Sequence, residues 1–153
     1  MIVLGVRCSN SGYAFAVLNG TKSLPVVVEA GSVGCPAGFS RCESLKWFFQ
    51  EMSDLLARHT VEGVAIKRYE GRAKGGRAYE DRVEYEGVAL LAAGNAGVTR
   101  ASKKASNTIA KDLGLKGRGR YLHTCLDTSP IAGFQGYDEK VQDSIRVAWS
   151  ELG

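Results

Sequence analysis

The segment from Lys67 to Arg77 combines residue types that suit phosphate binding. It reads Lys-Arg-Tyr-Glu-Gly-Arg-Ala-Lys-Gly-Gly-Arg. Glycine lets backbone amides approach a phosphate closely, and arginine adds forked, charged hydrogen bonds. Tyr69 and Tyr79 could stack on bases. Because the chain has no Walker motif and no GxGxxG, a solvated loop is the alternative interpretation. The candidate nucleic-acid contacts in this segment are Arg68, Arg72, Lys74 and Arg77.

A second basic set could extend this surface if folding places both segments on one side. Its predicted contacts are Lys103, Lys104, Arg118 and Arg120. Residues 67–120 hold 13 Lys or Arg against 6 Asp or Glu, a net charge of +7, whereas the whole chain carries +4. Such asymmetry favours a phosphate-rich partner, because neutralising phosphates releases counterions. Solvated basic helix faces are the alternative.

Thiol and zinc chemistry are not indicated. Cys8, Cys35, Cys42 and Cys125 form no CxxC pair and have no histidine at zinc spacing. Neither His59 nor His123 is tied to a cysteine by a recognisable signature. We therefore expect structural thiols and no cofactor.

Length and composition predict one globular domain over residues 1–153. Hydrophobic residues make up 44% of the chain and charged residues 24%, which is ordinary for a folded domain. No run approaches the roughly 18 apolar residues of a membrane span, and the N-terminus lacks a signal pattern. We expect a cytoplasmic protein without a membrane partner.

The first 60 residues predict a meander followed by a helix. Runs of branched and aromatic residues at 2–6, 12–18 and 25–30, separated by turn residues, predict three antiparallel strands. Ser40 and Glu43 have the spacing of a capping box. Apolar residues then recur on one helical face at Leu45, Phe48, Phe49, Met52, Leu55 and Leu56.

The remaining chain alternates between predicted strands and helices. Tyr79, Val83 and Leu90 are expected to face inward, residues 117–120 to form a flexible turn, and Asp138 to favour the start of the last helix. The predicted elements are a strand at 63–66, a helix at 77–94, a weak strand at 98–101, a polar helix at 102–113, a loop at 121–136 and a helix at 138–152.

This order of elements, with several local matches, resembles the RuvC-type resolvases of the ribonuclease H-like superfamily. Residues 3–17 are similar to the opening strand pair of that family, and 64–66 to the strand that ends in a catalytic glutamate. Residues 87–93 and 143–148 resemble its later helices. There is also likeness to an uncharacterised bacterial family whose fourth strand ends in Ile-Lys. The resemblance implies an α/β fold with a mixed five-stranded sheet flanked by helices.

The same resemblance implies a two-metal nuclease site built from carboxylates on the first strand, the fourth strand and the last helix. Magnesium, a hard cation, needs such oxygen ligands. Here the matching positions are Arg7, Lys67 and Asp143, so that two of the three are cations. This replacement should repel divalent ions, and we expect no metal at the inherited site.

Several interpretations of these positions stay open. Arg7, Lys67 and Asp143 could form an internal ion-pair cluster, or the two cations could bind phosphate directly. Our leading interpretation is a catalytically inactive RuvC-like domain that binds structured DNA or RNA. The alternatives are a protein-interaction or scaffold domain, including a homodimer, and a magnesium-dependent nuclease with relocated carboxylates. Those carboxylates would come from Glu70, Glu80, Glu84 or Asp138.

Overall fold

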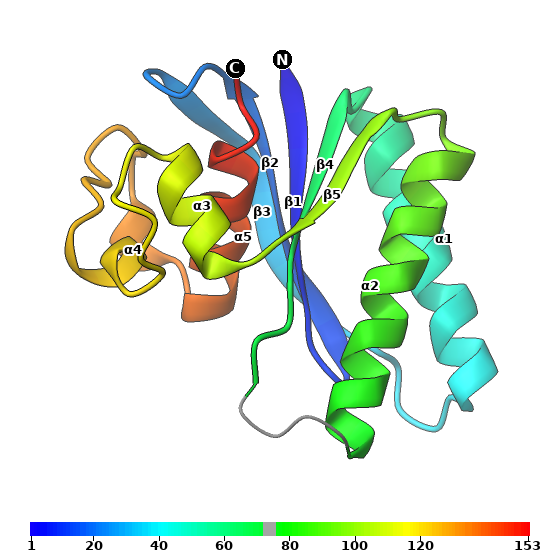
Figure 1. The fold of residues 1–153 in the computed structure, drawn as a ribbon. Helices are drawn as coiled ribbons and strands as arrows, with labels where there is room; N and C mark the ends of the chain where they lie inside the picture. The colour runs from blue at the N-terminus through cyan, green and yellow to red at the C-terminus, as the bar shows by residue number, and fades with distance from the viewer. Residues whose placement is uncertain (72–75) are drawn as a thin grey trace.

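The computed structural model describes residues 1–71 and 76–153, and its five strands form one open sheet in the order β3-β2-β1-β4-β5 (Figure 1). β1, β2 and β3 are antiparallel, whereas β4 and β5 run parallel to β1. This confirms the mixed five-stranded α/β sheet. The strands are β1 Ile2–Cys8, β2 Gly12–Gly20, β3 Pro25–Gly34, β4 Gly63–Lys67 and β5 Arg100–Lys104.

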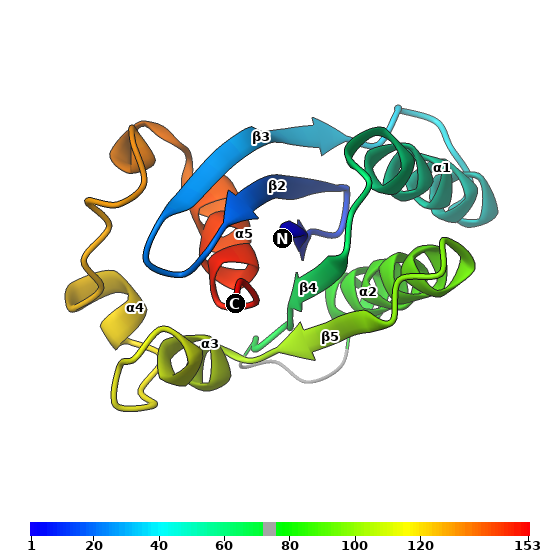
Figure 2. The same cartoon turned by 90° about the horizontal axis from the view of Figure 1, so that it is seen from above.

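Helices cover both faces of the sheet (Figures 1 and 2). α1 and α2 lie on one face, and α5 lies on the other, with α3 and α4 beside it. Side chains alternate along each strand, so each face has its own apolar core. The helices are α1 Arg41–His59, α2 Arg77–Asn95, α3 Ser106–Asp112, α4 Tyr121–Thr124, the 3₁₀ helix η1 Phe134–Gly136 and α5 Glu139–Trp149.

Gly5 allows α5 to lie directly on β1. A Cβ atom at this position would be 2.1 Å from the carbonyl oxygen of Ser144 and 2.7 Å from the Cβ of Ala148. No other residue type could accept this approach without moving the helix. The close packing also brings Asp143, the residue before Ser144, to the end of β1.

Two predicted helix starts are confirmed by their caps. The Ser40 hydroxyl accepts the Glu43 backbone N–H, and the Glu43 carboxylate accepts the Ser40 N–H. At the start of α5, the Asp138 carboxylate accepts the N–H groups of Lys140 and Val141 at 2.9 and 3.0 Å. These contacts are local, which is why residue spacing predicts them.

The predicted boundary between the fifth strand and the following helix was wrong. β5 extends to Lys104, and α3 begins only at Ser106. Ser102 and Lys103, expected to be helical, pair with Ala65 and Ile66 of β4. Pairing with a neighbouring strand overrides weak local preference.

Two further expectations need correction. The predicted loop at 121–136 contains α4 and η1. In α2 the deeply buried apolar residues are Tyr85, Ala89, Ala92 and Ala93. Leu90 packs against this core as expected but is only half-buried, as are Tyr79 and Val83. The Tyr85 ring packs edge-on against Phe48 of α1, with 4.9 Å between ring centroids, and this contact sets the inward face. Within the described ranges, no helix combines the length and hydrophobicity that a membrane span needs.

Candidate nucleic-acid interface

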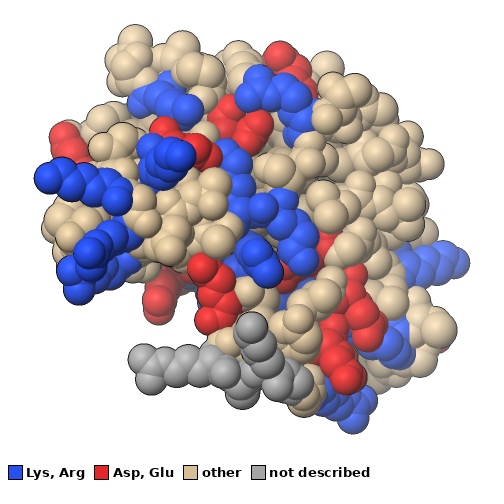
Figure 3. Space-filling view, viewed as in Figure 1, with Lys and Arg blue, Asp and Glu red and all other residues tan. Residues whose placement is uncertain are grey.

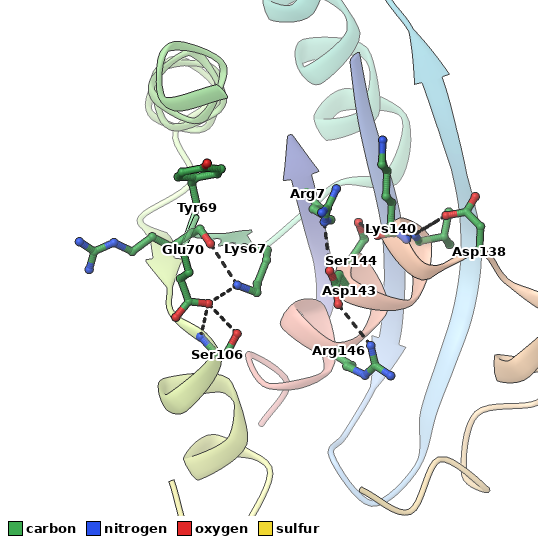
Figure 4. A network of polar contacts seen from close by, with 12 residues as sticks. Arg7, Lys67, Tyr69, Glu70, Ser106, Asp138, Lys140, Asp143, Ser144 and Arg146 are labelled. Carbon is green, nitrogen blue, oxygen red and sulfur yellow. Dashed lines mark hydrogen bonds and ion pairs between the residues drawn. The ribbon is translucent and has the colours of Figure 1, made fainter. Parts of the chain in front are cut away.

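Arg7 and Asp143 meet at the carboxyl edge of the sheet. β1 and β4 are parallel neighbours, so their ends lie together, and α5 begins at the same edge. Arg7 Nε donates to Asp143 Oδ2 at 3.0 Å, and Arg146 Nη1 donates to Asp143 Oδ1 at 3.2 Å (Figure 4). The predicted ion pair between Arg7 and Asp143 is therefore present, and both oxygens of the carboxylate are occupied by cations.

Lys67 does not join Asp143, contrary to the three-member cluster predicted above. Its ammonium pairs with Glu70 and donates to the Arg68 carbonyl oxygen at 3.0 Å. Glu70 also accepts the backbone N–H and the hydroxyl of Ser106, at 3.0 and 2.6 Å (Figure 4). Burial raises the pKa of Glu70, but the hydrogen bonds from Lys67 and Ser106 outweigh it and lower that pKa overall. Glu70 is thus bound to partners on β4 and α3.

Glu86 is a fully buried carboxylate that sequence reasoning missed. It is 0% exposed, and one of its oxygens lies 3.0 Å from Lys103 Nζ. Both oxygens accept the Tyr69 backbone N–H, each at 3.3 Å. Arg82 Nε is farther away, at 4.0 Å. The four-residue spacing of Arg82 and Glu86 is the one signal that could have indicated this pair.

Two arginines at this edge are largely buried without full compensation. The side chain of Arg82 is 12% exposed, and that of Arg146 is 6% exposed. Burial lowers the pKa of both guanidinium groups, and the neighbouring Arg7 lowers the pKa of Arg82 further. Among the described residues, the Nε atom of each has no hydrogen-bond partner. Their planes instead lie over aromatic rings, Arg82 on Tyr69 at 4.9 Å and Arg146 on Phe134 at 5.1 Å.

We call this group of charged residues the edge cluster. It has five cations and three carboxylates, so its formal charge is positive. Each carboxylate is engaged by at least one cation, and Arg7 and Lys67 stand at two of the three implied ligand positions. These residues do not fit a divalent metal ion. The edge cluster consists of Arg7, Lys67, Glu70, Arg82, Glu86, Lys103, Asp143 and Arg146.

The carboxylates considered for a relocated metal site lie apart, each in its own setting. Glu70 holds Lys67, and Asp138 caps α5. Glu84 pairs with Arg41 at 2.8 Å, and Glu80 is exposed in the first turn of α2. In the part of the chain that the structure describes, no group of three or more His, Cys, Asp or Glu could hold a metal ion.

Residues 117–120 are anchored to α3, although the sequence suggested a flexible turn. The Gly119 N–H donates to Asn107 Oδ1 at 2.7 Å. A Cβ atom at Gly119 would lie 2.6 Å from the Cβ of Ser106, so only glycine allows this contact. Ser106 is also bound to Glu70. The turn carries the exposed Arg118 and Arg120. It is therefore linked to Glu70, just after β4, through the contact of Gly119 with Asn107 and that of Ser106 with Glu70.

The remaining predicted contacts divide into exposed and internal positions. Arg68 and Arg77 are exposed, and the side chain of Lys103 is 28% exposed. Lys104 points inward and is paired with Asp112 and Glu151, so it is not part of an accessible surface. Arg72 and Lys74 lie outside the described residues. Figure 3 shows basic side chains in the centre of this face and over α3 and α4, with acidic ones between them.

A cavity of about 380 Å³ adjoins the edge cluster. Arg68, Tyr69, Tyr79 and Lys103 contribute to its lining. The two tyrosine rings contact each other edge-on, with 5.3 Å between centroids. Glu70, Glu86 and Val83 also line the cavity, so its walls combine aromatic rings with both cations and carboxylates.

Cys8 is not an activated nucleophile. It is buried in the core, and burial together with the nearby Glu86 carboxylate raises the pKa of its thiol. His59 lies elsewhere, 2.5 Å from Glu29 of β3. These placements agree with a structural thiol at Cys8.

Solved structures of Holliday junction resolvases have a fold similar to that of this chain. Thermus thermophilus RuvC, solved in complex with a Holliday junction substrate, superposes with a TM-score of 0.73 over 98% of this chain and 91% of that one, at 16% identity. A second T. thermophilus RuvC structure gives 0.73 over 98% and 92%, at 17% identity. The yeast mitochondrial resolvase Ydc2 gives 0.63 over 96% and 74%, at 10% identity.

Sequence comparison adds no closer relative. No protein-family model matches the chain, and no curated protein matches its sequence. Identities this low establish the fold alone. The expected ribonuclease H-like fold of the RuvC type is confirmed.

Proposed function

We propose that this RuvC-type domain binds structured nucleic acid through its basic surface and does not hydrolyse it by a two-metal mechanism. The observation that carries the proposal is the path of contacts from Glu70 to Ser106 and from Asn107 to Gly119, because it holds two basic segments side by side. The basic surface comprises Arg68, Arg77, Lys103, Arg118 and Arg120.

Four of the five cations of this surface are available for phosphates, whereas Lys103 is paired with Glu86. Arg68, Arg77, Arg118 and Arg120 are exposed, and within the described residues none of them forms an ion pair. Each phosphate that such a cation neutralises contributes about −0.9 to the slope of log affinity against log salt for duplex DNA. Four contacts therefore predict a slope of about −3.6.

The absence of hydrolysis follows from the charge of the edge cluster. Asp143 is the acidic residue at the implied ligand positions, and both of its oxygens already accept hydrogen bonds from arginines. We expect no cleavage of any substrate in Mg²⁺ or Mn²⁺, and unchanged binding when EDTA replaces the metal. Metal-dependent cleavage that Asp143→Asn abolishes would support the relocated nuclease instead.

Fluorescence anisotropy with a four-way junction, duplex DNA, single-stranded DNA and an RNA–DNA hybrid tests the proposal. The junction is included because the T. thermophilus RuvC neighbour was solved with one. We expect tight binding that favours a structured substrate and weakens steeply with salt. Weak binding to every substrate at low salt would overturn the proposal.

A matched pair of double variants tests the surface itself. Arg118→Gln with Arg120→Gln removes two charges from the basic surface, and Lys22→Gln with Lys46→Gln removes two exposed charges elsewhere. We expect the first pair to reduce the salt slope by about 2 and the control pair to leave it nearly unchanged. Equal losses from both pairs would mean that only net charge matters.

A protein-interaction role is the second candidate, and one observation favours it. Three apolar side chains at the sheet edge formed by β3 are exposed: Leu24 at 76%, Val26 at 59% and Val28 at 51%. Exposed edge strands with apolar side chains can pair with another chain. Sedimentation velocity would detect self-association that the double variant Val26→Lys and Val28→Lys abolishes. A monomer at all concentrations would remove support for the homodimer.

A further inference from the structure

Three hydrogen-bond donors converge on one oxygen of the Glu70 carboxylate. The ammonium of Lys67, the backbone N–H of Ser106 and the Ser106 hydroxyl all contact Oε2, the last two at 3.0 and 2.6 Å (Figure 4). Oε1 accepts no hydrogen bond from the described residues. A carboxylate oxygen offers about two lone pairs, so the three donors crowd Oε2 while Oε1 stays unused. The donors thus form an anion-binding arrangement that a single carboxylate oxygen fills imperfectly.

The lysine in this arrangement needs an anion. The side chain of Lys67 is only 11% exposed, at the end of β4. In the described part of the chain its ion pair is with Glu70, and its other contact is the Arg68 carbonyl oxygen. A buried ammonium without a negative partner is strongly destabilising. The position beside Lys67 and Ser106 therefore favours a negative group, whichever molecule supplies it.

Glu70 is held at this position only weakly. Its side chain is 38% exposed, so water screens its attraction to Lys67. A carboxylate that moves fully into water regains its hydration, and an incoming anion would keep Lys67 paired. Exchanging Glu70 for another anion should therefore cost little free energy.

A backbone phosphate of nucleic acid suits these donors. Its two non-bridging oxygens can divide the three donors between them, and lysine, serine and backbone N–H groups are common phosphate contacts in nucleic-acid complexes. Arg68, the residue after Lys67, is exposed and forms no ion pair within residues 1–71 and 76–153. A further cation of the basic surface thus adjoins the donors.

We propose that Lys67 and Ser106 form a phosphate-binding site that the Glu70 carboxylate occupies in this structure, and that a backbone phosphate displaces Glu70 when nucleic acid binds. Glu70 is then an internal competitor that lowers affinity. The bound phosphate would itself join Lys67 of β4 to Ser106 of α3, so the two basic segments stay side by side. This inference deepens the proposed function and rests on it for the source of the phosphate.

Removing the competitor tests the inference. Fluorescence anisotropy with the four-way junction compares the unmodified chain with Glu70→Ala and with the control Glu80→Ala, an exposed carboxylate in the first turn of α2. Both variants lose one negative charge. We expect Glu70→Ala to tighten binding at least about threefold and Glu80→Ala less than about twofold, because a solvated charge contributes little. Equal gains from the two variants, or no gain from Glu70→Ala, would overturn the inference.

A second background shows whether the gain depends on the proposed donors. When Lys67→Gln is already present, adding Glu70→Ala should no longer tighten binding, because the main donor is missing. A gain of the same size in this background would mean that net charge alone is responsible and would contradict the site. If Glu70→Ala lacks a native circular dichroism spectrum, Glu70→Gln replaces it, since the amide keeps the shape of the side chain and removes the charge.

Inorganic phosphate gives a readout that needs no nucleic acid. Titrated at constant ionic strength, with chloride as the reference, phosphate should raise the melting temperature of Glu70→Ala saturably, and that of Glu70→Ala with Lys67→Gln hardly at all. The lack of a rise in Glu70→Ala would overturn the inference. Phosphate binding without nucleic-acid binding would make the proposed function fail alone, whereas nucleic-acid binding that Glu70→Ala leaves unchanged would make this inference fail alone.

Discussion

Two neighbouring lysines on β5 belong to ion-pair clusters that differ in their balance of cations and carboxylates. Lys103 faces α2 and joins the edge cluster, whereas Lys104 faces α3 and α5. Lys104 Nζ lies 2.9 Å from Asp112 and 2.8 Å from Glu151, and Arg100 lies 3.0 Å from Glu151. We call these four residues the β5–α5 cluster. It has as many cations as carboxylates, while the edge cluster has an excess of cations and two guanidinium Nε atoms with no hydrogen-bond partner in the part of the chain that the structure describes.

Under the proposed function, this difference separates a structural role from a binding role. The β5–α5 cluster ties α3 and the end of α5 to the sheet and leaves no charge for a ligand. In the edge cluster, the Nε atoms of Arg82 and Arg146 have no hydrogen-bond partner within residues 1–71 and 76–153. Two lysines next to each other in sequence thus lie in different electrostatic environments, and the balance of charges around them is what distinguishes the two.

The largest expected effect comes from removing Lys104. Lys104→Met should lower the free energy of unfolding by about 3 kcal/mol, because Asp112 and Glu151 lose the cation they share. Arg82→Met should cost less than about 1 kcal/mol, because it also removes repulsion from Arg7. Urea denaturation measures both values. A larger loss of stability from Arg82→Met than from Lys104→Met would contradict the distinction between the two clusters.

Asp143→Asn should have the next largest effect, with stability and binding moving in opposite directions. Arg7 and Arg146 lose their anionic partner, so we expect a loss of about 2 kcal/mol in the free energy of unfolding. Affinity for nucleic acid should rise, since the edge cluster gains positive charge. Denaturation and anisotropy measure the two quantities, and weaker binding by the folded variant would count against a phosphate-binding edge.

Gly119→Ala tests geometry without changing charge. The added Cβ would lie 2.6 Å from the Cβ of Ser106, so the turn with Arg118 and Arg120 must move. We expect a loss of about 1 kcal/mol in stability and weaker binding at an unchanged net charge. Gly87→Ala is the control, because its Cβ meets no atom within 4 Å in the exposed part of α2. Equal binding by the two variants would show that the anchored turn is not needed.

The smallest effect concerns pH. The pKa of Glu70 is lowered in the folded state, so its contribution is present above the unfolded value of 4.5 and is lost as pH falls through the folded pKa. Because the side chain is 38% exposed, the contribution should not exceed about 0.5 kcal/mol. Glu70→Gln should therefore reduce the acid-induced loss of stability below pH 4.5 slightly, as measured by denaturation at pH 3 to 7. A steeper loss in the variant would contradict this sign.

Local patterns predicted the features that depend on neighbours in sequence. The Ser40–Glu43 box and the Asp138 cap are satisfied within four residues, so their spacing is enough to find them. The Arg7–Asp143 pair is separated by 136 residues and was found through the family resemblance. Neither residue spacing nor the family resemblance could identify the partners of Lys67 and Lys104. Each lysine has several candidate carboxylates, some near it in sequence and some on other elements, and the sequence does not say which of them it contacts.

The sequence by itself determined the order of the five strands and of α1, α2, α3 and α5, the caps of α1 and α5, and the cations at two implied metal positions. Apolar periodicity and short-range hydrogen bonds encode the first two, and residue identity at the positions matched by the RuvC resemblance gives the third. Only the tertiary structure decided that Glu86 is buried against Lys103, that Lys104 is neutralised, and that Arg82 Nε has no hydrogen-bond partner among the described residues. These outcomes depend on how side chains from separate elements meet, and charge compensation is decided by distances that residue order does not contain.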